Sequence, residues 1–291
     1  MEVKKTDVAG SKRTCMLKIK KLKPGFSLIE LLVVVSVISI LLAIIVPSLN
    51  KVKQKASAVV CLSNLNQWYL VIKMSTDDRN GYFHTGWAGN ANMDKSEWWM
   101  GHLRNYYDNI EEFRCCPIAK STRKSPPFKA WQWRYSQGVD QPDIGSYAIN
   151  GWVENKPDES FDSSEFFLQP DAKPNYWRNI KRIKNSSKVP LMTDSNWLDA
   201  WPQPDHKPPA ESDMEYSDQA GHFTRIVQDR HLKKQNVLFA DGSADTIDLK
   251  RLWTLKWHRN YDTAGPWTVA GGVTHDDWKE QASWMANYTD Y

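Results

Sequence analysis

The strongest hydropathy pattern in the chain is an uninterrupted apolar run close to its N-terminus. From Phe26 to Val46 the only ionisable side chain is Glu30. A helix of about 20 apolar residues can cross the hydrocarbon core of a membrane, so we expect a transmembrane helix over residues 26–46. A carboxylate inside such a helix costs about 2.5–3.5 kcal/mol at mid-membrane and less near an end. Glu30 is therefore expected to have a function.

Beyond Pro47 the apolar pattern changes from continuous to periodic. Apolar residues then recur every three or four positions, at Leu49, Val52, Ala56, Val59, Leu62, Leu65, Tyr69 and Ile72. This spacing places them on one face of a helix. It predicts an amphipathic continuation of the helix over residues 47–76, which the turn-forming sequence from Asp77 to Gly81 ends.

Residues 77–291 contain shorter patterns that are typical of strands and loops. We expect strands over residues 146–151, 188–194, 236–240 and 244–249. The last two flank residues 241–243 (Asp-Gly-Ser), a sequence that favours a hairpin turn, and an Asn-Gly pair at 150–151 predicts another turn. The polar, proline-containing stretches 154–174 and 198–219 predict surface loops. The expected fold is α+β, with the long N-terminal helix packed on an antiparallel sheet and a large Trp-rich insertion.

The basic residues are concentrated before the apolar run. Residues 1–25 contain eight Lys or Arg against two acids, whereas the whole chain has 38 basic and 34 acidic residues. Positive charge next to a transmembrane helix marks its cytoplasmic side. We therefore expect residues 1–25 to be a cytoplasmic leader and residues 77–291 to lie outside the cytoplasm. Since this lysine cluster already has a topological explanation, we expect no nucleic-acid partner.

The junction between the leader and the apolar run carries a specific motif. Gly25, Phe26 and Glu30, read together with the apolar residues that follow, resemble the cleavage and methylation site of type IV prepilins and type II secretion pseudopilins. The resemblance implies that a prepilin peptidase cuts between Gly25 and Phe26 and that Phe26 is N-methylated. It also implies that Glu30 pairs with the N-terminal amine of a neighbouring subunit during assembly.

Carried over to the whole chain, the resemblance implies a filament subunit. The subunit would join identical or related pseudopilins in a type II secretion pseudopilus or a type IV pilus-like filament. It would cross the bacterial inner membrane once, with its N-terminus in the cytoplasm and a pilin-like domain in the periplasm or at the cell surface.

Two simpler explanations of the apolar run remain open. A secretory signal has a shorter apolar region of about 7–15 residues, followed by a cleavage site with small residues. The sequence from Pro47 to Asn50 matches such a site poorly. An uncleaved signal anchor is compatible with the hydropathy.

A second motif lies near the C-terminus. His231 is followed after nine residues by Asp241 and Gly242, which resembles the His-x9-Asp-Gly motif of some prepilin-type proteins. In a structural interpretation, Asp241 caps a tight turn, Gly242 supplies a positive φ and His231 satisfies a buried backbone group. Alternatively, the resemblance to pseudopilins implies a calcium site. Its oxygen donors would be Asp194, Asp241, Ser243 and Asp245, and no other cofactor is expected.

The cysteines predict one cross-link. Cys15 lies in the leader, which leaves Cys61, Cys115 and Cys116 in the part expected outside the cytoplasm, where disulfides persist. A bond between the vicinal Cys115 and Cys116 would be strained, so we expect Cys61 to pair with Cys116. A metal site at these cysteines is weakly indicated because the chain has no Cys-x-x-Cys pair.

The chain contains 15 Trp, which predict either an aromatic core or exposed platforms that stack on sugar rings. Candidate platforms are Trp98 with Trp99, Trp131 with Trp133, and Trp197 with Trp201. They support an alternative function, a membrane-anchored surface protein that binds polysaccharide. We find no metalloprotease, serine-hydrolase or phosphate-loop motif, so we expect no enzymatic activity.

Overall fold

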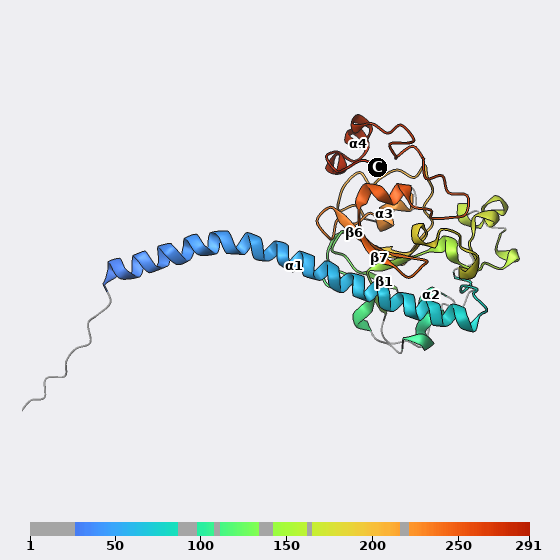
Figure 1. Ribbon diagram of the computed structural model, residues 1–291, viewed down its shortest axis with the longest axis horizontal. Helices are drawn as coiled ribbons and strands as arrows, with labels where there is room; N and C mark the ends of the chain where they lie inside the picture. Colours follow the sequence, from blue (N-terminus) through green and yellow to red (C-terminus); the bar gives the residue numbers. More distant parts are fainter. Residues whose placement is uncertain (1–26, 87–97, 108–110, 134–141, 162–164, 216–220) are drawn as a thin grey trace, which may run out of the picture. The chain divides into compact units, whose positions relative to one another are not determined.

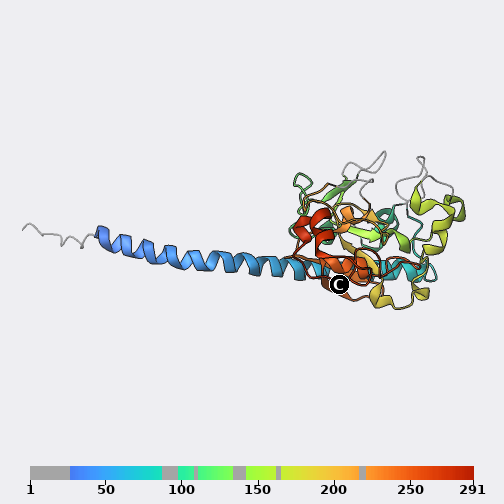
Figure 2. The ribbon, with the colours of Figure 1, turned by 90° about the horizontal axis from the view of Figure 1, so that it is seen from above.

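The computed structural model describes residues 27–86, 98–107, 111–133, 142–161, 165–215 and 221–291. The chain divides into two compact units, Met1–Asn50 and Lys51–Tyr291. Helix α1 (Leu28–Asp78) contributes to both and is drawn in blue and cyan in Figures 1 and 2. It continues through Pro47 without a break, as the sequence predicts.

The part of α1 in the first unit is apolar and exposed. Every residue from Leu28 to Asn50 is exposed, and the helix is long and apolar enough to cross a membrane. The hydroxyls of Ser36 and Ser39 donate to the carbonyls of Val33 and Val35. Because these serines find their partners within the helix, they add little polar surface to an otherwise apolar cylinder.

The part of α1 in the second unit packs on the sheet. Its buried side chains begin at Cys61 and recur with helical spacing: Cys61, Asn64, Leu65, Trp68, Val71, Ile72, Ser75 and Thr76. The predicted apolar face is right for Leu65 and Ile72. It is wrong for Leu49, Val52 and Val59, which are 60%, 60% and 66% exposed. The rest of the unit covers the helix only from about Ala58, whose carbonyl accepts from Asn236 Nδ2 at 3.1 Å, and Val59 lies on the uncovered side.

The helix ends where the sequence predicts. Asn80 and Gly81 both have positive φ, 56° and 93°, and the Gly81 N–H donates to the Thr76 carbonyl at 2.7 Å. A side chain at Gly81 would also place its Cβ 2.7 Å from the Asn179 side-chain oxygen. The turn therefore needs glycine both for its backbone conformation and for the close approach of residue 179.

Strands form one larger and one smaller sheet, which together with α1 confirm the α+β fold. The larger sheet has the order β5-β3-β4-β6-β7. Its strands are β3 (Tyr147–Asn150), β4 (Pro190–Asp194), β5 (Asp199–Ala200), β6 (Lys234–Phe239) and β7 (Ala244–Asp248). All of its pairs are antiparallel except β3 with β5, which is parallel. The smaller sheet pairs β1 (Trp131–Trp133) with β2 (Asp143–Gly145).

The remaining helices are short. The α-helices are α2 (Trp99–Leu103), α3 (Phe223–Ile226) and α4 (His275–Gln281). The 3₁₀ helices are Arg104–Tyr106, Glu111–Arg114, Gly151–Val153, Asp158–Ser160, Phe166–Leu168, Pro170–Asn175, Ile180–Arg182, Ser186–Lys188, Leu249–Thr254 and Ser283–Met285. Most of the second unit is therefore built from short elements and loops.

Two local predictions need correction. The Asn-Gly pair at 150–151 does not form a hairpin turn. Instead, the Asn150 side chain accepts from the Trp152 N–H and caps the 3₁₀ helix Gly151–Val153. The stretch 198–219 is not wholly a loop, because β5 lies within it and pairs with β3. A two-residue strand leaves too short a pattern to recognise in the sequence.

Tryptophan side chains hold the irregular segments together. Indole N–H groups donate to backbone carbonyls far away in sequence: Trp99 to Leu198, Trp131 to Tyr147, Trp152 to Pro202, Trp177 to Trp257 and Trp253 to His206. A buried loop carbonyl without a partner is costly. Each of these tryptophans therefore packs in the second unit and also donates a hydrogen bond to a backbone carbonyl of a distant segment.

Replacing Trp68 on α1 is expected to destabilise the second unit. Its side chain is fully buried and its ring packs 5.2 Å from Trp99, 5.2 Å from Tyr107 and 4.6 Å from Phe113. We expect Trp68→Ala to lower the free energy of unfolding by about 3–5 kcal/mol. Leu70→Ala is the matched control on the same helix, since Leu70 is 61% exposed, and should change it by less than about 0.5 kcal/mol. Denaturant titration of the detergent-solubilised chain measures both, and equal effects would contradict the assignment of Trp68 to the core.

Candidate functional site

The first turn of α1 holds the only acidic residue of its apolar segment. The Ser27 N–H donates to Glu30 Oε2 at 2.9 Å, and the Glu30 N–H donates to Ser27 Oγ at 3.2 Å. This reciprocal pair is a capping box, which satisfies two N–H groups at the start of the helix. The carboxylate also lies at the positive end of the helix dipole. Gly25 and Phe26 lie outside the described residues.

A second polar group of residues is buried where α1 meets the sheet. We call Cys61, Cys116, Asp194 and His231 the Asp194 cluster. They come from four places: the middle of α1, the segment after the 3₁₀ helix Glu111–Arg114, the end of β4 and the segment before β6. All four are buried, and one donor atom from each lies within 4.8 Å of the other three.

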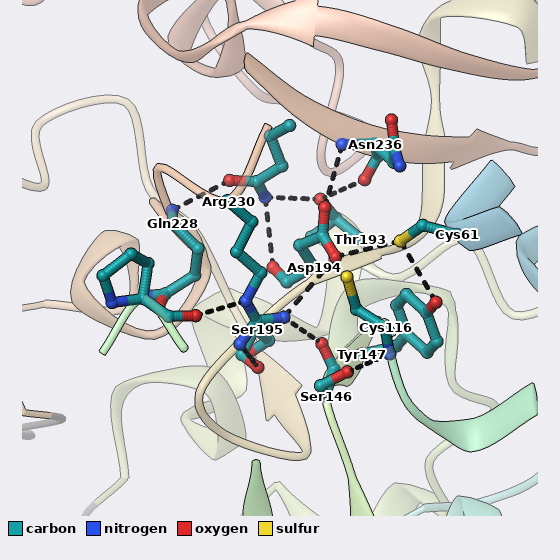
Figure 3. Close-up of polar contacts among 12 residues, drawn as sticks. Cys61, Cys116, Ser146, Tyr147, Thr193, Asp194, Ser195, Gln228, Arg230 and Asn236 are labelled. Atoms are coloured by element: carbon teal, nitrogen blue, oxygen red, sulfur yellow. Dashed lines mark hydrogen bonds and ion pairs between the residues drawn. The ribbon is translucent and has the colours of Figure 1, made fainter. Parts of the chain in front are cut away.

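Asp194 makes most of the polar contacts in this cluster, and Figure 3 shows those with Cys61, Arg230 and Asn236. Its Oδ1 accepts from Cys61 Sγ at 3.3 Å and lies 3.4 Å from Arg230 Nη1. Its Oδ2 accepts from the Asn236 N–H at 3.0 Å and lies 3.4 Å from His231 Nε2. The side chain is fully buried, so these contacts replace the water that a carboxylate needs.

Arg230 connects the cluster to the surrounding backbone. Its guanidinium is also fully buried and donates to four carbonyls, those of Pro127, Lys129, Ser146 and Ser195. The planar guanidinium has five donors in a fixed geometry, which suits it to bring separate segments together. Nothing in the sequence points to Arg230 except its position beside His231 in the C-terminal motif.

Each of the two sulfurs also contacts a side chain other than Asp194. Tyr147 Oη donates to Cys61 Sγ at 3.1 Å, and Cys116 Sγ lies 3.5 Å from His231 Nε2. The Cys116 N–H donates to Ser146 Oγ, which fixes the loop that carries Cys116 against the start of β3. Both sulfurs therefore lie close to the Asp194 side chain, Cys61 from α1 and Cys116 from the loop after the 3₁₀ helix Glu111–Arg114, as Figure 3 shows.

The surroundings shift the pKa values of all four groups. Burial disfavours the charge on His231, but attraction and hydrogen bonding to Asp194 outweigh it and raise the pKa of His231 to about 10. Burial likewise opposes ionisation of Asp194, yet His231 and Arg230 hold its pKa below the usual value.

The two thiols differ from each other. A hydrogen bond from Cys61, with a further one from His231, lowers the pKa of Cys116 to about 6 against the effect of burial. Burial, followed by the contact with Cys116 and the charge of Asp194, raises the pKa of Cys61 well above its usual value. Of the two, Cys116 is the thiol that ionises more readily.

The expected disulfide is not present in the structure. Cys61, Cys115 and Cys116 are all buried free thiols. The structure does bring Cys61 and Cys116 together, as predicted, but Cys61 Sγ contacts Asp194 and Tyr147, and Cys116 Sγ contacts His231. The carboxylate and imidazole were not expected beside the two sulfurs.

The hairpin turn agrees with the structural interpretation of Asp241 and Gly242. Asp241 Oδ1 accepts from the Ser243 N–H at 2.9 Å and from Ser243 Oγ at 2.6 Å, and Gly242 has a φ of 90°. A Cβ at Gly242 would lie 2.6 Å from the ring of Tyr69, so the turn packs directly on α1. His231, in contrast, faces Asp194 and Cys116 rather than a backbone group.

The predicted calcium ligands are not brought together. Asp194 is buried at one end of β4, whereas the other end, Pro190, pairs with Phe239 next to the hairpin turn. Asp241, Ser243 and Asp245 are exposed at that turn. Because the length of β4 separates them from Asp194, the four residues do not form one site.

The predicted tryptophan platforms also need correction. Trp99 and Trp131 are 1% and 2% exposed and belong to the core, and Trp201 is buried as well. Trp98 and Trp133 are half-buried and pack on each other with ring centres 4.9 Å apart. In β1, Trp131 and Trp133 alternate with the exposed Gln132, as a strand requires, but their shared side faces other aromatic rings.

One partly exposed indole borders a pocket. The pocket has a volume of about 280 Å³ and is lined by Thr122, Lys129, Ala130, Trp131, Gln132, Asn196, Trp197 and Glu215. Trp197 is half-buried and its ring lies 6.0 Å from that of Trp133. Aromatic and polar side chains therefore meet at this pocket.

The comparisons with known proteins identify the N-terminal segment. Residues 20–46 match the family model of the prokaryotic N-terminal methylation motif. No curated protein and no solved structure matches the chain. The matched segment includes Gly25, Phe26 and Glu30 and extends along the exposed apolar part of α1, which fits a single-pass membrane anchor. The chain therefore carries the prokaryotic N-terminal methylation motif at residues 20–46, the motif found in prepilin-like proteins.

Proposed function

We propose that the chain is a subunit of a type II secretion pseudopilus or a type IV pilus-like filament. The observation that carries this proposal is the methylation motif at residues 20–46, placed at the start of an exposed apolar helix. A prepilin peptidase cuts between Gly25 and Phe26 and methylates the new N-terminus. The filament contains identical or related subunits.

The exposed half of α1 supports an assembly role. From Leu28 to Asn50 the helix has no buried residue, whereas from Cys61 onwards one face is covered by the second unit. An apolar helix of this kind is stable in a membrane or in contact with other apolar helices, and not in water. The subunit therefore moves between two apolar surroundings, the bilayer before assembly and the filament interior afterwards.

Glu30 favours transfer of the subunit from the bilayer into the filament and fixes its position relative to the neighbouring subunit. In the isolated subunit its carboxylate has one partner of its own, the Ser27 N–H, which offsets part of the cost of placing it in a membrane. In the filament the N-terminal amine at Phe26 of a neighbouring subunit replaces that neutral donor. A charged donor forms a bond roughly twice as strong as a neutral one, and the gain is largest in apolar surroundings.

The proposed topology follows from the charge distribution. The basic residues 1–25 stay in the cytoplasm, the helix crosses the inner membrane, and the domain that follows lies in the periplasm or at the cell surface. The peptidase then removes the whole leader, including Cys15.

Processing is tested at the N-terminus of the protein itself. We expect protein extracted from membranes to begin at N-methylated Phe26, because the motif places the cut after Gly25. Intact-mass measurement with N-terminal sequencing checks this. Cells that lack the prepilin peptidase are the control and should retain the full precursor mass. A mature protein that begins at Met1, or beyond residue 47, would contradict the proposal.

Variants of Glu30 separate its charge from its capping bond. Glu30→Gln keeps an oxygen that accepts from Ser27 but removes the charge, whereas Glu30→Ala removes both. We expect both variants to insert in the membrane normally and to reduce the sheared-filament fraction at least about tenfold, the effect of losing roughly 1.4 kcal/mol per contact. Ser27→Ala, which removes only the capping hydroxyl, is the control and should assemble. Normal filaments from Glu30→Gln would show that the charge is not used.

A second candidate function is carbohydrate binding at the pocket beside Trp197. Sugar rings stack on exposed aromatic faces and hydrogen-bond with neighbouring polar side chains. The pocket supplies the half-buried indole of Trp197 with Gln132, Asn196 and Glu215 around it. A filament or surface protein with such a pocket would capture polysaccharide, and this role is compatible with the assembly role.

Affinity electrophoresis with neutral polysaccharides tests this second function. We expect Trp197→Ala to lose the retardation that the unaltered chain shows, since one stacked ring contributes about 1–2 kcal/mol. Trp284→Ala is the control, because Trp284 is also half-buried but lies against Pro209. Equal retardation of both variants, or none of the unaltered chain, would remove carbohydrate binding from this pocket.

A further inference from the structure

We propose that the Asp194 cluster is a buried transition-metal site of the tetrahedral kind that Zn²⁺ prefers, with Cys61, Cys116, Asp194 and His231 as its ligands. The assembly role of Glu30 makes no use of these residues. They nevertheless bring two thiols, a carboxylate and an imidazole to one buried point from four separate parts of the chain.

The spacing of the donor atoms fits a coordination tetrahedron. Zinc binds sulfur at about 2.3 Å and nitrogen or oxygen at about 2.0–2.2 Å, so neighbouring ligand atoms around it lie about 3.3–3.8 Å apart. Cys61 Sγ lies 3.3 Å from Asp194 Oδ1, His231 Nε2 lies 3.4 Å from Asp194 Oδ2, and Cys116 Sγ lies 3.5 Å from His231 Nε2. The contacts with Cys61 and His231 involve different oxygens of Asp194, whereas a tetrahedral site uses one of them. One donor atom from each of the four residues lies within 4.8 Å of the other three, so the side chains must move closer by about 1 Å to complete the tetrahedron.

One of these three contacts is longer than a typical hydrogen bond. An N–H···O bond has a donor–acceptor distance of about 2.7–3.2 Å, and the separation of 3.4 Å between His231 Nε2 and Asp194 Oδ2 is longer. The two side chains face each other across a gap that a metal ion would bridge.

The donor types select the metal. Thiolate and imidazole ligands favour Zn²⁺ and similar late transition metals, whereas Ca²⁺ requires six to eight oxygens. The Asp194 cluster supplies one carboxylate and is buried on all sides. Four protein ligands without an open position are typical of a structural zinc site rather than a catalytic one.

The charges balance when the metal is bound. A divalent ion with two thiolates and the Asp194 carboxylate leaves one negative charge, and Arg230 supplies the opposite charge 3.4 Å from Asp194 Oδ1. Arg230 and the Asn236 N–H also fix the orientation of the carboxylate, as hydrogen bonds around metal ligands usually do. Binding releases to solvent every proton that the two thiols and His231 Nε2 carry. It ties α1 to β4, to the segment before β6 and to the Cys116 loop.

Metal analysis of the full chain in detergent tests this proposal. We expect about one Zn²⁺ per chain, a stoichiometry set by the four ligands, measured by inductively coupled plasma mass spectrometry. After removal of the metal with a chelator under reducing conditions, added Co²⁺ should produce the intense visible absorption of a tetrahedral site and the ultraviolet band of thiolate-to-cobalt charge transfer. These spectra need no variant, so they remain informative if a substituted chain fails to fold.

Two variants locate the site. His231→Ala should reduce metal content and remove the cobalt spectrum, whereas Cys115→Ser should leave both unchanged. Cys115 is the matched control because it is also buried, lies next to Cys116 and is not among the clustered ligands. Retention of metal by His231→Ala, or loss of it only in Cys115→Ser, would contradict the ligand assignment.

The competing outcome is a disulfide between Cys61 and Cys116. Intact mass under non-reducing conditions, combined with titration of free thiols in denaturant, distinguishes the two. Two reactive thiols at Cys61 and Cys116 after chelation support the metal site. A chain whose mass is lower by two hydrogen atoms, or a reduced chain that binds neither Zn²⁺ nor Co²⁺, would overturn it.

Discussion

The second unit is organised around the need to neutralise one buried carboxylate. An ionised Asp194 without partners would be prohibitively costly in a dry interior, and the fold supplies Arg230, His231, Cys61 and the backbone of Asn236 to meet that need. Because Asp194 ends β4 and these partners come from α1, β6 and the segment that precedes β6, satisfying Asp194 also fixes how the helix lies on the sheet. The four carbonyl contacts of Arg230 extend this constraint to the loops around the smaller sheet.

The parts of the fold that depend on local pattern could be predicted from the sequence, whereas the parts that depend on distant partners could not. Three features have a signal within a few residues. Hydropathy marks the apolar half of α1, and Gly81 marks the turn that ends the helix. The Asp-Gly pair marks the β6–β7 hairpin. Asn150 was misjudged because its side chain caps the following 3₁₀ helix and also donates to the carbonyls of Pro190 and Trp257. Those contacts lie outside any local window.

The two candidate sites also differ in whether their residues are close together in the sequence. The Glu30 motif lies in one continuous segment, and the family model recognises it. The Asp194 cluster combines residues as far apart in the sequence as Cys61 and His231, which are 170 positions apart. Hydrophobic periodicity does not predict contacts between such distant residues. The spacing of His231 and Asp241 can be recognised in the sequence, but it suggests that the two residues belong to one site. In the structure, Asp241 shapes a turn against Tyr69 while His231 faces Asp194.

The hydrogen bonds from indole N–H groups to backbone carbonyls affect which surface positions of this protein can tolerate substitution. Loops usually keep their shape through hydrogen bonds made by their own residues, which restricts the sequence at their surface. Here Trp99, Trp152 and Trp253 hold the backbone of distant loops from inside the core. The outward-facing side chains of those loops are therefore not needed to hold the loop backbone in place. Substitutions at these outward-facing positions should therefore change the surface of the second unit while leaving its interior unchanged.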